Sequence, residues 1–506
     1  MIPEFSAIFL RVFAALCYTF AFVSAFRSAW RDEHGREYSD FERVWGVDLK
    51  TKDRCTNVTS LTLIFPMGLA LIFAGFVWRY GWQAAPAQFF RFSSDLLLTM
   101  SVYYLALFVL MPALRQRVSA RACATAWLLP TILFYAIVIA DEAPMPRLVI
   151  CCPAWLIDLL VPVWLVGFLL VFGWFVVSHL RFRRRVLKAS SDETDEAVLD
   201  VWRQELAALE LKTRIRLVRC ATAATPFSMP GTRKNRLTVL PVCSYTEDEL
   251  RLIFRHELHH IQRSDFDAKF FFAFLCALFW FHPLVWMAAR ESAKDMELSC
   301  DEIVLDQASD AERKRYADLL LHTAGETRGF TTCLSADAAS LRYRLRNVMQ
   351  KRPRRPGTGL LAAFLFVCFL FHGTLAFADE RCTVGELLVD ADGMDHFLYE
   401  VYDRETGYYD SINEAEAKDK AAEALRDYLL SLSAERLIGS VDHKYSEDRS
   451  PRLYLSDSSG SVQGVRFYDH GITVDNWYQP RGEGRIMVYY VRENIDWEKI
   501  EAIIFE

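Results

Sequence analysis

The sequence lacks any pair of cysteines in the CxxC spacing, although it has 12 cysteines among its 506 residues. This absence excludes a zinc knuckle identified from cysteine spacing. Only Cys382 lies beyond Asp379, so the last part of the chain cannot form a disulfide within itself. The chain also lacks a strong positive charge, because its formal net charge is -6. We therefore expect no direct binding of nucleic acid.

Apolar and charged residues are both abundant. Hydrophobic residues make up 52% of the chain and charged residues 24%, which is too apolar for a disordered protein and too charged for membrane spans alone. The length allows roughly three or four domains of about 100 to 200 residues. Residues 379–506 carry 14 Lys+Arg against 28 Asp+Glu, whereas residues 1–378 carry 44 against 36. A basic body and an acidic tail indicate two parts in different surroundings.

The first part of the chain contains apolar stretches long enough to cross a bilayer, which takes roughly 20 helical residues. Basic residues between 181 and 188 follow the last stretch, and such a cluster marks the cytoplasmic side. The sequence thus predicts a membrane domain over residues 1–178, in the lipid bilayer of the bacterial inner membrane, with the N-terminus outside. The predicted spans are residues 5–26, 59–78, 94–114, 122–140 and 155–177.

A sixth apolar segment, residues 359–378, follows a basic cluster and is predicted to run outward as the final transmembrane helix, within residues 356–378. Residues 179–355 are then cytoplasmic and residues 379–506 extracytoplasmic. The end of this segment, Ala376-Phe377-Ala378, also has the small-x-small form of a signal-peptidase site. Release of the tail after Ala378 is the alternative to a retained span.

The apolar run Phe270 to Phe281 is too short to be a span. Its 12 residues cover only about 18 Å as a helix, and Pro283 interrupts its continuation. We expect a buried or membrane-edge helix here. Before it, the pattern predicts a surface helix over residues 192–211 and short strands at 214–220 and 237–242.

The next predicted helix carries a metal-binding pattern. It begins with a capping box at Thr246 and Glu249. His256 and His260 are four residues apart, so both imidazoles lie on one face and can bind one Zn²⁺. Glu257 beside them can take a proton from the attacking water while the metal polarises a peptide carbonyl. The alternative is an amphipathic helix with surface histidines.

A hydrolytic zinc site needs three protein ligands and one open position. We expect Glu297 as the third ligand, on a second helix where Asp301 lies one turn further on. This pairing also bears on the apolar run. If Phe270 to Phe281 crossed the bilayer, Glu297 and His256 would stand on opposite sides, so the run must return or stay buried.

The ordered motifs RHELHHIQRSD, FHPLVW, ELSCDEIVL, RYADLLL and LRYRLRNVM resemble the BlaR/MecR-type antirepressor zinc metallopeptidases, peptidase family M fifty-six, over roughly residues 155–378. The resemblance implies Zn²⁺ bound by His256, His260 and Glu297, with Glu257 as the catalytic base. Asp265 and Asp301 match family positions that we expect to orient the imidazoles. We interpret Cys300, in the same motif, as a packing residue.

The resemblance implies a mostly α, polytopic membrane protein with a cytoplasmic gluzincin-like α+β metalloprotease domain. Members of this family cleave themselves or a cytoplasmic repressor after an external signal, so a winged-helix repressor is an expected substrate. The stretch between Phe330 and Arg346 is a candidate self-cleavage region. The open alternatives are a constitutive quality-control protease related to the Ste24-like membrane peptidases, and a receptor without catalytic activity.

The tail departs from the beta-lactam receptors of this family. No serine after Asp379 is followed by lysine three places on, which excludes a penicillin-binding sensor with an SxxK nucleophile. The tail pattern predicts a small α+β domain, with a helix at about 414–432 and strands at 452–455, 465–468 and 485–491. Its extracytoplasmic ligand is unknown.

Overall fold

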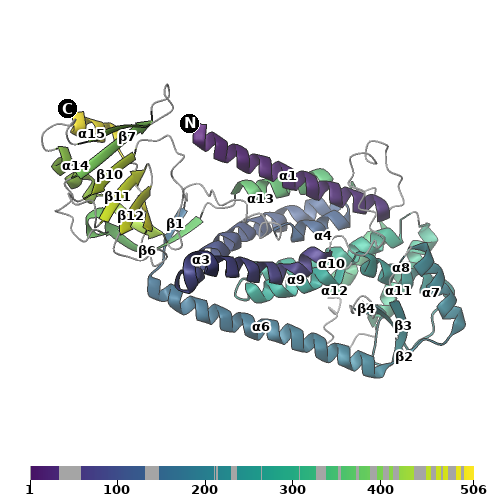
Figure 1. Ribbon diagram of the computed structural model, residues 1–506. Helices are drawn as coiled ribbons and strands as arrows, with labels where there is room; N and C mark the ends of the chain where they lie inside the picture. The colour runs from purple at the N-terminus through teal and green to yellow at the C-terminus, as the bar shows by residue number, and fades with distance from the viewer. Residues whose placement is uncertain are drawn as a thin grey trace.

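The computed structural model describes most of the chain and shows a helical body with a β-rich tail (Figure 1). The described residues are 2–33, 59–130, 148–371 and 375–505, apart from gaps at 210, 212–214, 230–235, 264, 307, 326–337, 351–354, 388–395, 403–408, 414–420, 438–451, 457–462, 469–470, 477–485 and 492–494.

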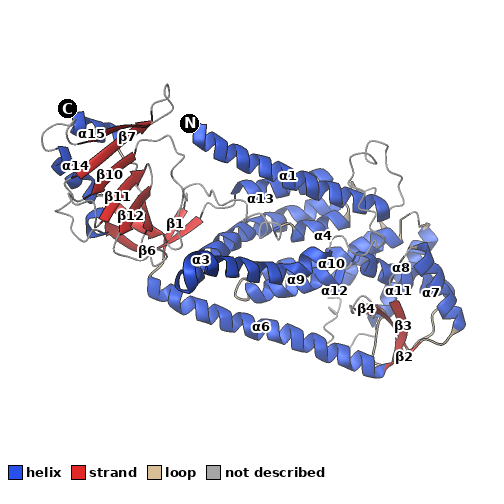
Figure 2. Cartoon of the chain, in the orientation of Figure 1, coloured by secondary structure: helices blue, strands red, loops and turns tan. Residues whose placement is uncertain are grey.

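Six helices form an apolar bundle in the middle of the molecule (Figure 2). They are α1 (Ile2–Glu33), α3 (Thr59–Arg117), α4 (Ala120–Leu128), α9 (Asp265–Leu278), α10 (Pro283–Val304) and α13 (Thr358–Phe371). Their shared core includes four side chains that are fully buried: Met100 and Leu107 of α3, Trp127 of α4 and Leu361 of α13. Side chains of α9 and α10 enter this same core, so the bundle is continuous with the part of the chain that carries the metal pattern.

Two helices of the described chain are long and apolar enough to cross a membrane, namely Leu96–Arg117 within α3 and Leu159–Ala189 within α6 (Ala154–Ala189). The predicted spans 59–78 and 94–114 both lie in α3, which continues through a kink at Gly81, where φ is 76°. A positive φ at this kink suits glycine, which has no Cβ to clash. The predicted span 122–140 begins in α4, and residues 131–140 lie outside the described residues.

The apolar run at 270–281 does turn back, as expected. Helix α9 ends at Leu278 and α10 begins at Pro283, so the two form a hairpin within the bundle. Phe274 of α9 packs edge-on against the ring of Phe168 in α6 at 5.7 Å, and Trp164 donates a hydrogen bond to the Leu278 carbonyl at 2.7 Å. The hairpin brings the C-terminal half of α10 back to the end of the bundle where α9 began.

A four-stranded sheet with helices follows α6 and forms the scaffold of the site. Its order is β2-β3-β5-β4, with β3 and β5 parallel and the outer pairs antiparallel. Trp202 and Phe254 pack with ring centroids 4.9 Å apart and join the first two helices of this region. The elements are β2 (Ser190–Asp192), α7 (Glu196–Ala208), β3 (Ile215–Cys220), β4 (Phe227–Met229), β5 (Arg236–Pro241), α8 (Glu247–Arg263), α11 (Asp310–Gly325) and α12 (Ala338–Met349).

The end of the predicted final span differs from expectation. Helix α13 ends at Phe371, and residues 375–378 belong to strand β6 (Leu375–Thr383) instead of a helix extending to Ala378. The reason is a partner strand, β1 (Leu148–Cys151), which pairs with β6 in parallel and satisfies its backbone groups. This pairing joins the segment just before α6 directly to the tail.

The tail is an α+β domain, as the pattern predicted. Its sheet has the order β1-β6-β9-β13-β12-β11-β10-β7-β8, and α14 (Ala421–Leu430) and α15 (Trp497–Phe505) contribute to a common core with it. The three predicted strands are confirmed, and residues 414–420 of the predicted helix lie outside the described residues. The other elements are η1 (Val384–Leu387), β7 (His396–Tyr402), β8 (Tyr409–Asn413), β9 (Ser433–Leu437), β10 (Arg452–Ser456), β11 (Gln463–Tyr468), β12 (Gly471–Asn476) and β13 (Ile486–Val491).

Candidate metal centre

Helix α8 places two imidazoles side by side. Its capping box forms as predicted, because the backbone N–H of Thr246 donates to Glu249 Oε2 at 2.8 Å. One face of α8 is buried through Phe254, Leu258 and neighbouring apolar residues, which fixes the rotation of the helix. His256 and His260 are both largely buried, and their Nε2 atoms lie 3.1 Å apart.

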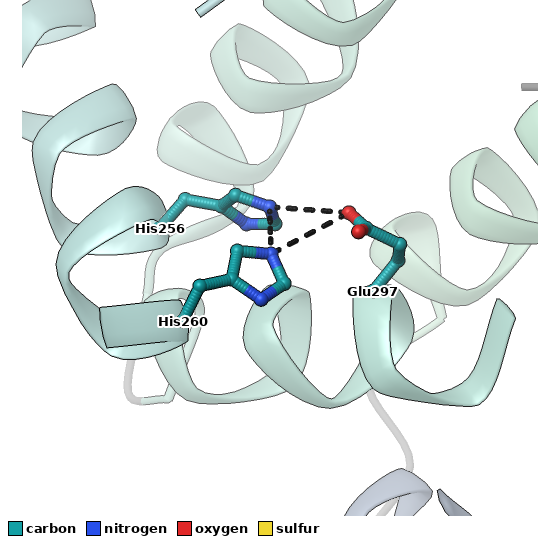
Figure 3. A group of neighbouring side chains, drawn as sticks. All are labelled: His256, His260 and Glu297. Carbon is teal, nitrogen blue, oxygen red and sulfur yellow. Dashed lines mark hydrogen bonds and ion pairs between the residues drawn. The ribbon is translucent and has the colours of Figure 1, made fainter. Parts of the chain in front are cut away.

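Glu297 approaches this pair from α10, as Figure 3 shows. Its Oε2 lies 3.4 Å from His256 Nε2 and 3.6 Å from His260 Nε2. A tetrahedral zinc ion with bonds of about 2.0–2.1 Å needs donor atoms roughly 3.3 Å apart. The triangle of two imidazole nitrogens and one carboxylate oxygen therefore fits a zinc ion, and this donor set is the one that hydrolytic zinc sites use.

Carboxylates and a phenol hold the other ring nitrogens. His260 Nδ1 lies 2.6 Å from Oδ2 of Asp265, and His256 Nδ1 lies 3.3 Å from Oδ1 of Asp301. The Tyr316 hydroxyl, on α11, donates to Asp301 Oδ1 at 2.7 Å and lies 3.0 Å from His256 Nδ1. Partners on Nδ1 keep each ring oriented with Nε2 toward the centre of the donor triangle.

Two basic side chains complete the surroundings of Glu297, and the sequence pattern identified neither of them. Arg344 of α12 donates to both oxygens of Asp301, at 2.7 and 2.6 Å, and its Nη1 lies 3.5 Å from Glu297 Oε2. Lys269 of α9 lies 3.5 Å from Glu297 Oε1. Arg344 falls within the candidate self-cleavage stretch, whose residues 330–337 lie outside the described residues. The only sequence signal for it was its place in the LRYRLRNVM motif.

The electrostatics of the site favour a cation. Burial opposes ionisation of Glu297, yet the neighbouring charges of His260 and Lys269 hold the pKa of this carboxyl well below its usual range. Burial likewise opposes the charge on His260, but Cys300, Glu297 and Asp265 together raise the pKa of this imidazole well above its ordinary value. The negative field that attracts a proton to His260 also attracts a metal cation.

The remaining motif residues have distinct positions. Glu257, next to His256, is 8% exposed, and its backbone carbonyl accepts a hydrogen bond from Ser228 of β4 at 3.5 Å. His259 Nδ1 lies 3.0 Å from Gln262 Oε1. Burial lowers the pKa of His259 to about 3, so this imidazole is neutral. His259 belongs to neither candidate metal group of the described residues.

Cys300 lies closer to the site than a plain packing residue would. Its Sγ is 3.5 Å from His260 Nδ1 and 3.7 Å from Asp265 Oδ2, and these three residues form a second candidate metal group. The two groups share His260. Because Asp265 occupies Nδ1 of that ring, Nε2 is left facing His256 and Glu297, which favours the first group.

Comparison with known proteins agrees with this site. Residues 150–348 match the family model described as BlaR1 peptidase M56. This part of the chain is similar to the peptidase domain of BlaR/MecR-type proteins. The matched residues contain α8, α10, α11 and most of α12. They therefore include all three residues of the donor triangle together with Tyr316 and Arg344.

One curated relative supports the same family. The regulatory protein BlaR1 of Bacillus licheniformis is 22% identical over 182 residues, which make up 36% of this chain and 30% of that protein. The chain thus matches less than a third of that relative's length. The comparisons therefore relate residues 150–348 to a family of metallopeptidases. Of the two long apolar helices of the described residues, Leu159–Ala189 lies within this range and Leu96–Arg117 precedes it.

Proposed function

We propose that the chain is a membrane-embedded zinc endopeptidase that acts as a regulatory signal transducer. The observation that carries this proposal is the triangle formed by His256 Nε2, His260 Nε2 and Glu297 Oε2 inside the peptidase domain. A bound zinc ion would supply a Lewis acid that polarises a peptide carbonyl.

The chain's own residues would carry out the proton transfers. Glu257 follows a proposed ligand directly on α8 and is our candidate base, which takes the proton from the attacking water and passes it to the leaving amine. Asp265 and Asp301 keep the imidazoles oriented. Arg344 holds Asp301 in place, and its Nη1 lies 3.5 Å from Glu297 Oε2.

The arrangement of the chain supports the proposed topology. In Figure 1 the helices of the apolar bundle lie between the tail sheet and α8, the helix that carries His256 and His260. We place residues 1–178 in the bacterial inner membrane, residues 179–355 in the cytoplasm, residues 356–378 as the final membrane segment and residues 379–506 outside. The position of strand β1 supports transmission of a signal from the tail. Strand β1 pairs with β6 of the tail and is followed within three residues by α6. The other end of α6 leads directly into β2 of the four-stranded sheet.

The proposed substrates are the chain itself and a cytoplasmic winged-helix repressor, and the proposed signal is a ligand of the tail. The BlaR1 relative is named a regulatory protein, which favours a regulator over a constitutive protease.

The test is replacement of Glu257 by glutamine in the full-length chain. E257Q should retain zinc, because no proposed ligand is lost, and should stop the formation of fragments from the chain or from a co-expressed repressor. The matched control is E196Q, the same chemical change on the exposed surface of α7. Fragments that form at an unchanged rate in E257Q would rule out the proposed activity.

A further inference from the structure

Helix α10 has two polar faces with different partners. Glu297 and Asp301 face the metal centre, whereas Glu291, Asp295 and Glu302 recur at helical spacing on the opposite side and contact the apolar bundle. Of these, Glu302 accepts a hydrogen bond from the first backbone N–H of α4 at 2.8 Å. Glu297 therefore lies on a helix whose opposite face is held by contacts with the apolar bundle.

The strongest of these contacts is made by Arg115, in the last turn of α3. Its Nε and Nη2 donate to the two oxygens of Asp295, both at 2.8 Å, and Nη2 also donates to Glu291 at 2.7 Å. Trp127 of α4 donates to Asp295 Oδ2 at 2.9 Å. Asp295 is 0% exposed. The two parallel hydrogen bonds from the planar guanidinium fix both the position and the orientation of its carboxylate.

Arg115 also reaches the helix that carries Arg344. Its guanidinium carbon lies 5.4 Å from the ring centroid of Tyr343, in cation–π contact. The next residue, Arg344, holds Asp301 and approaches Glu297. Arg115 is thus connected to the metal centre in two ways. It binds Asp295, which lies on the same helix as Glu297, and it contacts Tyr343, which precedes Arg344 on α12.

The same end of α3 contacts the chain that leads to the final apolar helix. The backbone N–H of Arg355 donates to the Arg117 carbonyl at 3.1 Å, and the N–H of Ser119 donates to the Arg355 carbonyl at 2.9 Å. Gly357 follows with φ 81°, and a Cβ there would lie 2.3 Å from Val118. Arg115 therefore lies where the membrane helix α3, the metal helix α10 and the connection between α12 and α13 meet.

We infer that Arg115 is a positioning residue of the metal centre, which fixes Glu297 through Asp295 and through the pair Tyr343 and Arg344. The inference rests on the proposed function, because it assigns Arg115 a role toward the zinc ion that Glu297 would bind. Arg115 contacts none of the three proposed ligands. It acts by holding two helices whose side chains do, and it links the geometry of the donor triangle to the position of a membrane helix.

A structural role alone would make a different prediction. A buried ion pair that merely stabilises the fold would change thermal stability when replaced, and would leave the zinc affinity of the folded protein unchanged. A positioning role changes zinc affinity in protein that is folded. The decisive measurement is thus zinc affinity, determined by competition with a chelating dye on the purified full-length chain.

The main variant is R115M/D295N, which removes both charges together and leaves an acceptor for Trp127. Glu291 keeps Lys294 as a partner at 2.7 Å. The matched control is R219M/E193Q, which removes a second largely buried pair. Its Arg219 Nε, on β3, lies 2.5 Å from Oε2 of Glu193, the residue that follows β2. We expect zinc affinity to fall about 10-fold to 100-fold in R115M/D295N, as for residues that support metal ligands, and to stay within about twofold in the control.

A milder variant covers the case in which the double variant does not fold. R115K keeps the positive charge and loses the planar fork, and we expect about 3-fold to 10-fold weaker zinc binding. Unchanged affinity in folded R115K and R115M/D295N would overturn the inference while leaving the proposed function intact. If the unmodified chain itself binds no zinc, the proposed function fails first, and the inference fails with it.

Discussion

His260 Nδ1 lies 2.6 Å from Oδ2 of Asp265, the first residue of the apolar helix α9. This contact ties the orientation of a proposed zinc ligand to the hairpin of α9 and α10, which is part of the apolar bundle. The aspartate that orients the ring and the phenylalanines that anchor α9 belong to one helix, so the bundle and the metal centre share a structural element.

The contact predicts the effect of replacing Asp265 by alanine. D265A leaves His260 free to rotate and to present the wrong nitrogen, so zinc affinity should fall about 10-fold to 100-fold. Competition with a chelating dye measures this. The control D306A removes an exposed carboxylate just after α10 and should leave affinity unchanged. Equal affinities in the two variants would show that the contact with Asp265 does not orient His260 for zinc binding.

Arg344 predicts a loss of stability. Asp301 is 1% exposed, and R344A leaves its charge buried without the bidentate partner. We expect destabilisation of about 3–5 kcal/mol, as for other buried pairs that lose one member. R342A, on the exposed side of the same helix, should change stability by less than about 0.5 kcal/mol. Thermal unfolding in detergent compares the two, and similar midpoints would contradict the importance of the Arg344 contacts.

The raised pKa of Asp267 predicts that the stability of the protein to unfolding depends on pH. Burial raises its pKa from 3.8 to about 6, although Arg236 acts in the opposite direction. A carboxyl whose folded pKa is raised contributes stability that is present below the unfolded value and is lost as pH rises through the folded value. D267N should therefore be more stable than the unmodified chain at pH 7–8, by about 1–3 kcal/mol, with the difference vanishing near pH 4. Unfolding midpoints that show the same difference at both pH values would refute this.

The burial of Ala378 predicts that residues 379–506 stay covalently attached to the rest of the chain. The Ala378 side chain is fully buried, and its carbonyl accepts a hydrogen bond from the backbone N–H of Cys152 at 2.6 Å. A peptidase needs an accessible, extended segment, and opening β6 would break its pairing with β1 and β9. Immunoblots of E257Q with a C-terminal tag should show only full-length chain. A fragment beginning at Asp379 would establish release instead.

The spacing of residues was sufficient to identify part of the site. His256 and His260 repeat at one helical turn, so local geometry alone brings their rings together. The capping box at Thr246 is likewise local, and it forms as expected. The return of the apolar run followed from a requirement on Glu297, because one side of the membrane must hold both halves of the site.

Other parts depend on tertiary contacts that no local pattern encodes. Tyr316 and Arg344 reach the site because α11 and α12 pack against α8 and α10, and both residues lie far from His260 in the sequence. Strand β1 has only four residues, and its partner β6 is distant in the sequence. The expected helix to Ala378 was therefore wrong at its end, because hydropathy does not reveal a strand partner.

The central claim is a zinc ion held by His256, His260 and Glu297, and X-ray absorption at the zinc edge of the purified full-length chain tests it most directly. We predict about one zinc per chain, with only nitrogen and oxygen neighbours at about 2.0–2.2 Å. A sulfur neighbour at about 2.3 Å would place the ion on Cys300 with His260 and Asp265, and would contradict the account.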